Sequence, residues 1–142
     1  MVNQEYQIIA HNFELAGRAS SDIKKTLKQL NYPQHFIKRV CAASYEAEIN
    51  IVIHSFGGYA LFELQENFVK LEFFDDGPGI LDIDLAMIEG YSTASEVAHA
   101  NGFGAGMGLP NIKRLADTFE IRSDLYGTHL IITFQLEKAH ES

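Results

Sequence analysis

The sequence FVKLEFFDDGPGI, residues 68–80, joins a predicted β-strand to a glycine-containing turn. Residues 68–74 alternate between an inward apolar set and an outward set, which is the period of a strand with one buried face. The inward set is Val69, Leu71 and Phe73. The strand ends at Asp75, whose carboxylate could accept a hydrogen bond from an exocyclic amine such as that of adenine, while Gly77 and Gly79 would let the turn backbone approach the ring. An ordinary turn after a strand is the alternative, since Asp and Gly are common in turns.

A second glycine run, GFGAGMGL, occupies residues 102–109. Its glycines are Gly102, Gly104, Gly106 and Gly108. Alternating glycines expose backbone N–H groups, and the run leads into an apolar helix whose N-terminus offers unpaired donors and partial positive charge to a phosphate. The missing Lys-Ser/Thr argues against a P-loop, and neither the spacing nor a preceding βαβ unit fits a dinucleotide fold. A flexible linker is the alternative, but linkers rarely open straight into an apolar helix.

Upstream of both glycine motifs, Glu46 and Asn50 lie four residues apart in a predicted helix, so they share one helix face. The side-chain carbonyl of Asn is a hard oxygen ligand that suits Mg²⁺. A Glu one turn away could accept a proton from an attacking hydroxyl or water. The alternative is a solvated Glu beside an ordinary helix Asn. With the two glycine motifs, the pair makes an ATP site the first hypothesis.

The rest of the chain alternates helical and strand patterns. The predicted helices are 23–30, capped by Ser20, Ser21 and Asp22, then 33–55, 82–89 and 108–118. The predicted strands are one or two within 5–14, then 59–65, 68–74, 119–123 and 128–136. The apolar stripe of the long helix is Phe36, Val40, Ala47, Ile51 and His54. Residues 90–107 are predicted to form a mobile loop and 137–142 a frayed tail. This order predicts one domain over 1–142, an α+β two-layer α/β sandwich with a mixed, mostly antiparallel sheet and helices on one face.

Composition narrows the classes of partner. The chain has 142 residues, 46% of them hydrophobic, and a net charge of −8 without a basic patch, so we expect a globular protein with no nucleic-acid partner. No apolar run is long enough to span a membrane, and the N-terminus lacks the pattern of a signal peptide. The single cysteine, Cys41, fits a reducing compartment, so we expect a cytoplasmic protein. His54 as a phospho-acceptor is a weaker hypothesis than a structural role for this residue.

Taken in order, these motifs resemble those of the GHKL, or Bergerat-fold, ATP-binding family, whose members include histidine-kinase catalytic domains, gyrase, Hsp90 and MutL. The likeness runs from about residue 20 to residue 136. The matching motifs are Glu46-x-x-x-Asn50 for the N box, Asp75-x-Gly77-x-Gly79 for the first glycine box, Gly102 to Leu109 for the second, and Gly127-Thr128 for the final Gly-Thr element. Three boxes in the family's order make the resemblance specific.

The resemblance implies ATP and Mg²⁺ as cofactors. It makes Asn50 the Mg²⁺ ligand and Glu46 the catalytic base or water-orienting residue. It implies that Asp75 reads adenine with support from Gly79 and Thr128. The nucleotide contacts that it implies are Asn50, Asp75, Gly77, Gly79, Ile80, Gly102, Gly104, Gly106, Met107, Gly108, Leu109 and Thr128.

Length and two further stretches favour one branch of the family. Gyrase, Hsp90 and MutL modules are larger, and 142 residues leave no room for the dimerisation helix of a sensor histidine kinase. Residues 75–93 and the run GLPNIKRL, 108–115, look closest to the small serine kinases of bacterial partner-switching systems, nearer the RsbT type than the anti-sigma factors RsbW and SpoIIAB. Residues 94–101 make the lid loop longer than in those switch kinases.

This branch implies a kinase that phosphorylates Ser or Thr on a STAS-domain partner, either an anti-anti-sigma factor or a stressosome-type protein. Two alternatives stay open. One is an anti-sigma factor that acts mainly by sequestering a sigma factor, and the other is a nucleotide-gated adaptor with little catalysis. The resemblance leaves room for a homodimer.

Overall fold

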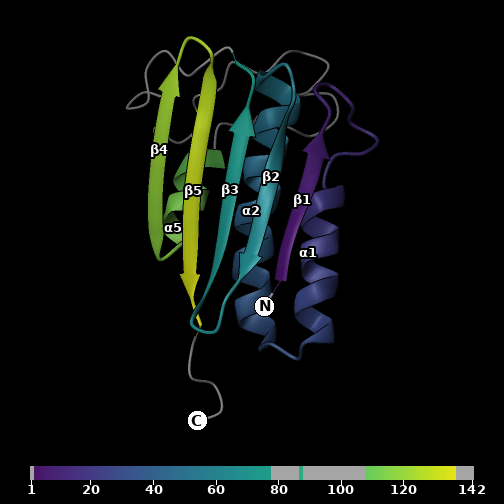
Figure 1. The fold of residues 1–142 in the computed structure, drawn as a ribbon, viewed down its shortest axis with the longest axis vertical. Coiled ribbons are helices and arrows are strands. Elements are labelled where there is room, and N and C mark those ends of the chain that lie inside the picture. Colours follow the sequence, from purple (N-terminus) through teal and green to yellow (C-terminus); the bar gives the residue numbers. More distant parts are fainter. Residues whose placement is uncertain (1, 78–86, 88–107, 137–142) are drawn as a thin grey trace.

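The structure is a computed structural model that describes residues 2–77, 87 and 108–136. Its elements are β1 (Val2–Ile8), α1 (Arg18–Gln29), α2 (Gln34–His54), β2 (Gly58–Leu64), β3 (Phe68–Asp75), α5 (Gly108–Leu115), β4 (Thr118–Asp124) and β5 (Gly127–Gln135). The strands form one sheet in the order β1-β2-β3-β5-β4, and all three helices cover the same face of it (Figure 1).

The two-layer α+β architecture is confirmed. The sheet was expected to be mixed and mostly antiparallel, and the four pairings among the described strands are all antiparallel. The physical reason lies in the connections, because β2–β3 and β4–β5 are hairpins and a hairpin makes its two strands antiparallel neighbours.

The core lies between the sheet and the helix layer, as the strand alternation predicts. In the central strands the inward positions are buried, and across β3 and β5 Leu71 pairs with Ile132. The buried sets are Val69, Leu71 and Phe73 in β3, Leu130, Ile132 and Phe134 in β5, and Phe36, Val40, Ala47 and Ile51 in α2. His54, the last residue of α2, is half-buried, and burial lowers its pKa.

Three predicted boundaries are wrong, each for a reason of tertiary structure. The first strand ends at Ile8, because a turn follows in which the N–H of His11, at a positive φ, donates to the carbonyl of Val52 in α2. Helix α1 begins at Arg18, ahead of the expected cap at Ser20. Helix α5 ends at Leu115, and β4 then begins at Thr118.

The start of α1 is capped from α2. Glu48 is buried, and its carboxylate accepts the backbone N–H groups of Gly17 (2.9 Å), Ala19 (3.2 Å) and Ser20 (3.0 Å) and the Ser20 hydroxyl (2.8 Å). The first N–H groups of a helix have no intrahelical acceptor, so these bonds replace the local side-chain cap that the sequence predicts. Gly17 supplies the left-handed conformation (φ 93°) of the N-cap residue.

The end of α5 is held by the same helix. Arg39 of α2 donates from Nε (3.2 Å) and Nη2 (2.9 Å) to the carbonyl oxygen of Leu115, and its guanidinium pairs with Asp117 at 3.2 Å. These contacts satisfy a carbonyl that the helix end leaves without an intrahelical partner. Through Glu48 and Arg39, α2 therefore fixes both of the helices that flank it.

Several expected features lie outside the described residues, namely the loop 90–107, the tail 137–142, and the helix 82–89 apart from Met87, which packs against the core. In the part of the chain that is described, no helix combines the length and apolarity needed to cross a bilayer.

We expect Glu48→Gln to lower the free energy of unfolding by about 1–3 kcal/mol, because an amide brings two donors to a buried site that already holds three N–H groups. Urea denaturation measures the change. The control is Glu66→Gln, which removes the same charge at an exposed turn position. Equal stability of the Glu48→Gln variant and the control would show that the Glu48 cap contributes nothing.

Candidate nucleotide-binding site

Two of the three predicted motifs meet at one end of the molecule. The end of β3, the start of β5 and the C-terminal end of α2 lie together there (Figure 1). Backbone hydrogen bonds fasten the turn after β3 to the chain that leaves α2, from the N–H of Phe56 to the carbonyl of Gly77 (2.8 Å) and from the N–H of Asp76 to the carbonyl of Gly57 (2.9 Å). The Asp75 turn is thereby tied directly to the helix that carries Glu46 and Asn50.

Asp75 is held in one orientation by backbone donors. Its Oδ1 accepts the N–H groups of Gly77 and Thr128, each at 3.0 Å. Burial raises the pKa of Asp75, the two N–H groups oppose that shift, and the neighbouring Asp76 adds to it. Both donors bind Oδ1, so Oδ2 is the atom that would accept a hydrogen bond from an exocyclic amine.

The turn between β4 and β5 approaches the end of β3 so closely that position 127 requires glycine. A Cβ on Gly127 would lie 2.1 Å from the carbonyl oxygen of Asp75, far inside any real contact. The next residue, Thr128, donates to Asp75 through its N–H and shares a 2.8 Å hydrogen bond with Ser123 through its hydroxyl. The predicted Gly-Thr element therefore lies against the predicted base-binding Asp.

Asn50 lies against the N-terminus of α5. A Cβ on Gly108 would be 3.1 Å from both Nδ2 and Oδ1 of Asn50. Only a glycine gives the first residue of α5 this close approach without displacing the amide. A helix N-terminus is a site where anions such as phosphate bind. The predicted metal ligand, Asn50, is therefore a neighbour of an element suited to hold phosphate.

Glu46 faces the same helix one turn earlier. Burial raises its pKa above 4.5, and a hydrogen bond with the Asn111 side chain opposes the shift. The Oδ1 of Asn111 also accepts a hydrogen bond from Arg114. A half-buried carboxylate with a raised pKa is suited to accept a proton, which is the role predicted for Glu46.

The structure places the other predicted contacts as follows. Leu109 is buried in the core, so its backbone alone is available to a ligand. Outside the described residues lie Gly79, Ile80, Gly102, Gly104, Gly106 and Met107. Over the described ranges no three His, Cys, Asp or Glu side chains form a metal cluster, so Asn50 is the oxygen ligand on which the Mg²⁺ prediction depends.

Sequence reasoning missed Asn111 and Glu48. Asn111 lies in the first turn of α5, three residues after Gly108. Its side chain forms a hydrogen bond with Glu46 of α2. Glu48 follows Ser44 at helical spacing, and both are buried facing α1, where Ser44 bonds the Ser20 hydroxyl at 2.8 Å. A second polar pair at i, i+4 within an apolar helix was the pattern that could have revealed Glu48.

The family model described as "Histidine kinase-, DNA gyrase B-, and HSP90-like ATPase" matches residues 33–138, which is most of the chain. The chain belongs to this family. This is the GHKL family that the motifs resemble, so the prediction of family is confirmed.

Two individual proteins are similar to parts or to the fold of the chain. Over 49 residues the chain is 45% identical to the serine/threonine-protein kinase RsbT of Bacillus subtilis (strain 168), a match that covers 34% of this chain and 31% of RsbT. The fold is similar to the crystal structure of the RsbU and RsbW domains of a Mycobacterium tuberculosis protein, with a TM-score of 0.66 and 15% identity, over 96% of this chain and 33% of that one. The chain thus spans about a third of the relatives it matches, and the second likeness concerns the fold alone.

We expect Gly108→Ala to lower the free energy of unfolding by at most about 1 kcal/mol, because the added methyl group would lie 3.1 Å from the Asn50 amide and displace it, while the higher helix propensity of alanine offsets part of that cost. In an Asn50→Ala background the same change should cost almost nothing, since the amide is gone. Urea denaturation of the four proteins forms a double-mutant cycle. Additive effects would mean that Gly108 and Asn50 do not press on each other.

We also expect the pKa of the Glu46 carboxyl group to lie above that of an exposed glutamate, and higher still in Asn111→Ala, which removes the bond that opposes the shift. Since the folded-state pKa is the higher one, this group's contribution to stability is complete below its unfolded pKa and falls as pH rises through its folded pKa. Carbon-13 NMR of the glutamate carboxyl groups follows the titration, with exposed Glu66 as the internal control. An unchanged Glu46 midpoint in Asn111→Ala would contradict the contact.

Proposed function

We propose that this chain is an ATP-dependent serine/threonine-protein kinase of a bacterial partner-switching system, and that it phosphorylates a STAS-domain regulator in the cytoplasm. The observation that carries the proposal is the meeting of Glu46 and Asn50 with the first turn of α5, through Asn111 and Gly108. Membership of a family of ATPases supports nucleotide binding, and the partial likeness to RsbT supports transfer to a protein hydroxyl.

The residues fit ATP and Mg²⁺ on two observations. The glycines at 108 and 127 let the start of α5 and the start of β5 lie close against Asn50 and Asp75, so the predicted phosphate, metal and base contacts are brought to neighbouring positions. The oxygens on offer are an amide and a carboxylate, which are the hard ligands and acceptors that Mg²⁺ and an adenine amine take. When bound, ATP supplies the phosphoryl group and Mg²⁺ neutralises charge on its oxygens.

Each residue then has a separate task. Asp75, fixed by two backbone donors, would orient the base, and the N–H groups at the start of α5 would be available to the phosphates. The side-chain oxygen of Asn50 would hold the metal. Glu46, whose pKa is raised by burial, would accept the proton of the attacking Ser or Thr hydroxyl as its oxygen bonds to the γ-phosphorus of ATP, while the bond from that phosphorus to the bridging oxygen breaks and ADP leaves. Phosphoryl transfer depends mainly on positioning and electrostatics, which this set provides.

We expect Asn50→Ala to lose Mg²⁺-dependent nucleotide affinity and kinase activity together. Glu46→Gln should bind ATP almost normally but transfer phosphate roughly 10²–10⁴-fold more slowly, because an amide cannot accept the proton. Calorimetry measures binding, and transfer of radiolabelled phosphate from ATP to a purified STAS-domain protein measures activity. Glu66→Gln is the matched control.

Wild-type transfer rates in both variants would remove Glu46 and Asn50 from the mechanism. A wild-type protein that binds ATP, phosphorylates no STAS-domain protein and forms a stable complex with a sigma factor would favour the sequestering alternative. ATP binding with neither activity would favour the nucleotide-gated adaptor.

A further inference from the structure

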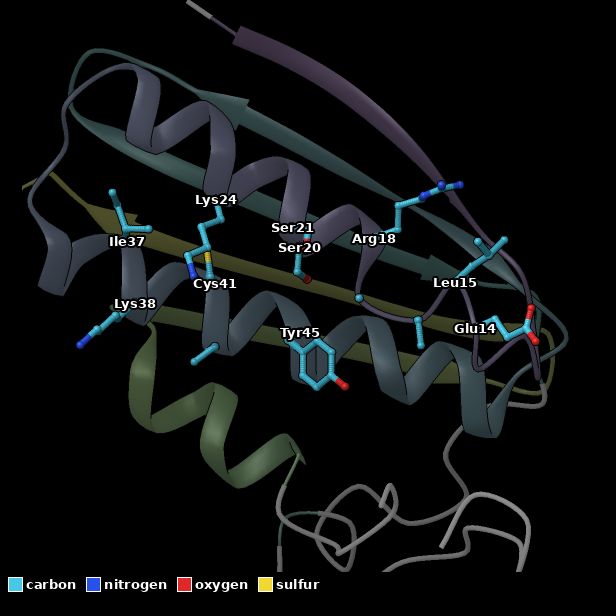
Figure 2. A pocket seen from close by; sticks show the side chains of 13 residues that line it. Glu14, Leu15, Arg18, Ser20, Ser21, Lys24, Ile37, Lys38, Cys41 and Tyr45 are labelled. Carbon is cyan, nitrogen blue, oxygen red and sulfur yellow. The ribbon is translucent and has the colours of Figure 1, made fainter. Parts of the chain in front are cut away.

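An open groove lies between α1 and α2 (Figure 2), and neither Glu46 nor Asn50 lines it. Its volume is about 700 Å³, and none of the predicted nucleotide contacts lines it. Figure 2 shows that its side chains extend along the two helices, from Ile37 and Lys38 at one end to Leu15 and Glu14 at the other. A long, open shape between two helices suits a segment of polypeptide better than a compact small molecule.

The floor of the groove is apolar. Ile37 is buried and Cys41 is half-buried on the α2 side. Tyr45 stands exposed in the middle of the groove, with its ring packed so closely over Gly17 that a Cβ there would lie 2.9 Å from ring carbon Cε1. An occupant with apolar side chains would find a preformed surface on these three residues.

The rim of the groove is basic, although the net charge of the whole chain is negative. The sequence carries 19 acidic and 11 basic residues, yet Arg18, Lys24 and Lys38 line this groove against one acid, Glu14. Lys24 projects from α1 toward Cys41 (Figure 2). Burial raises the pKa of the Cys41 thiol to about 11, and Lys24 and Lys28 oppose that shift, so these two ammonium groups act at the groove floor.

We propose that this groove docks an acidic amphipathic segment of a partner protein. Its apolar side chains would rest on Ile37, Cys41 and Tyr45, and its carboxylates would pair with Lys24 and Lys38. Charge complementarity of this kind raises the association rate and selects the partner. A short acidic segment would meet mainly the basic rim, whereas an extended anionic membrane or a nucleic acid would also face the rest of a chain whose net charge is −8. The proposal does not depend on kinase activity.

The test selects ligands for the groove from a random peptide library displayed on phage, with the wild-type protein as bait. The double variant Lys24→Glu/Lys38→Glu serves for counter-selection, and both positions are exposed, so the fold should persist. Lys25→Glu is the matched control, because it reverses an exposed lysine on the same helix outside the groove. Selected peptides are then measured by fluorescence anisotropy at several salt concentrations.

Cys41 provides a second readout that locates the peptide. It is the only cysteine in the chain and lies on the groove floor, so its rate of alkylation by N-ethylmaleimide, followed by mass spectrometry, reports occupation of the groove. We expect the enriched peptides to be acidic and amphipathic, to bind Lys24→Glu/Lys38→Glu at least about tenfold more weakly, to bind Lys25→Glu normally, and to slow alkylation of Cys41.

Three results would overturn the proposal. The first is no enrichment, or enriched peptides without acidic excess. The second is equal binding to the wild type and to Lys24→Glu/Lys38→Glu, or no protection of Cys41 at saturating peptide. The third is binding to phosphatidylserine vesicles that Lys24→Glu/Lys38→Glu abolishes while no peptide is selected, which would make the groove a lipid-binding surface instead.

Discussion

The carboxylate of Glu48 is buried where α1 meets α2 and accepts three backbone N–H groups from the start of α1. A buried charge is tolerated only when donors surround it, so this contact admits one rotation of α2 about its own axis. Glu46 precedes Glu48 by two residues, and Asn50 follows it by two. At 3.6 residues per turn, two residues rotate a side chain by about 200° about the helix axis, so both lie on the side of α2 opposite Glu48. Fixing Glu48 toward α1 therefore turns Glu46 and Asn50 toward α5.

Sequence patterns predicted the parts of the fold that depend on the spacing of apolar residues along one strand or one helix. Alternation in residues 68–74 placed Val69, Leu71 and Phe73 in the core, and the helical stripe of α2 did the same for Phe36 and Val40. The boundaries failed where a distant residue decides the outcome. Ser20 is a plausible cap by local rules, but its N–H and hydroxyl go to Glu48, 28 residues along the chain. The end of α5 likewise depends on Arg39, 76 residues away from Leu115.

The candidate site divides in the same way. Asp75, Asn50 and Gly108 could be proposed from residue type and spacing, because a carboxylate after a strand and a glycine before a helix have direct chemical meanings. Asn111 could not, since its importance comes from which helix it faces. The reason for glycine at 108 and 127 also appears only in three dimensions, where a Cβ at 127 would collide with the Asp75 carbonyl and a Cβ at 108 would press on the Asn50 amide.

Two glutamates on one helix show how surroundings assign roles to the same side chain. Glu48 has four donors on its two oxygens, which commits it to holding α1 and leaves it no part in proton transfer. Glu46 is half-buried and hydrogen-bonded to the Asn111 side chain, and its pKa is raised because burial outweighs that bond. A carboxylate whose pKa is raised by burial binds a proton more readily, which suits the role of general base proposed for Glu46. A separation of two residues thus turns Glu48 toward α1 and Glu46 toward α5, and the side of α2 that faces α5 carries the residues proposed for catalysis.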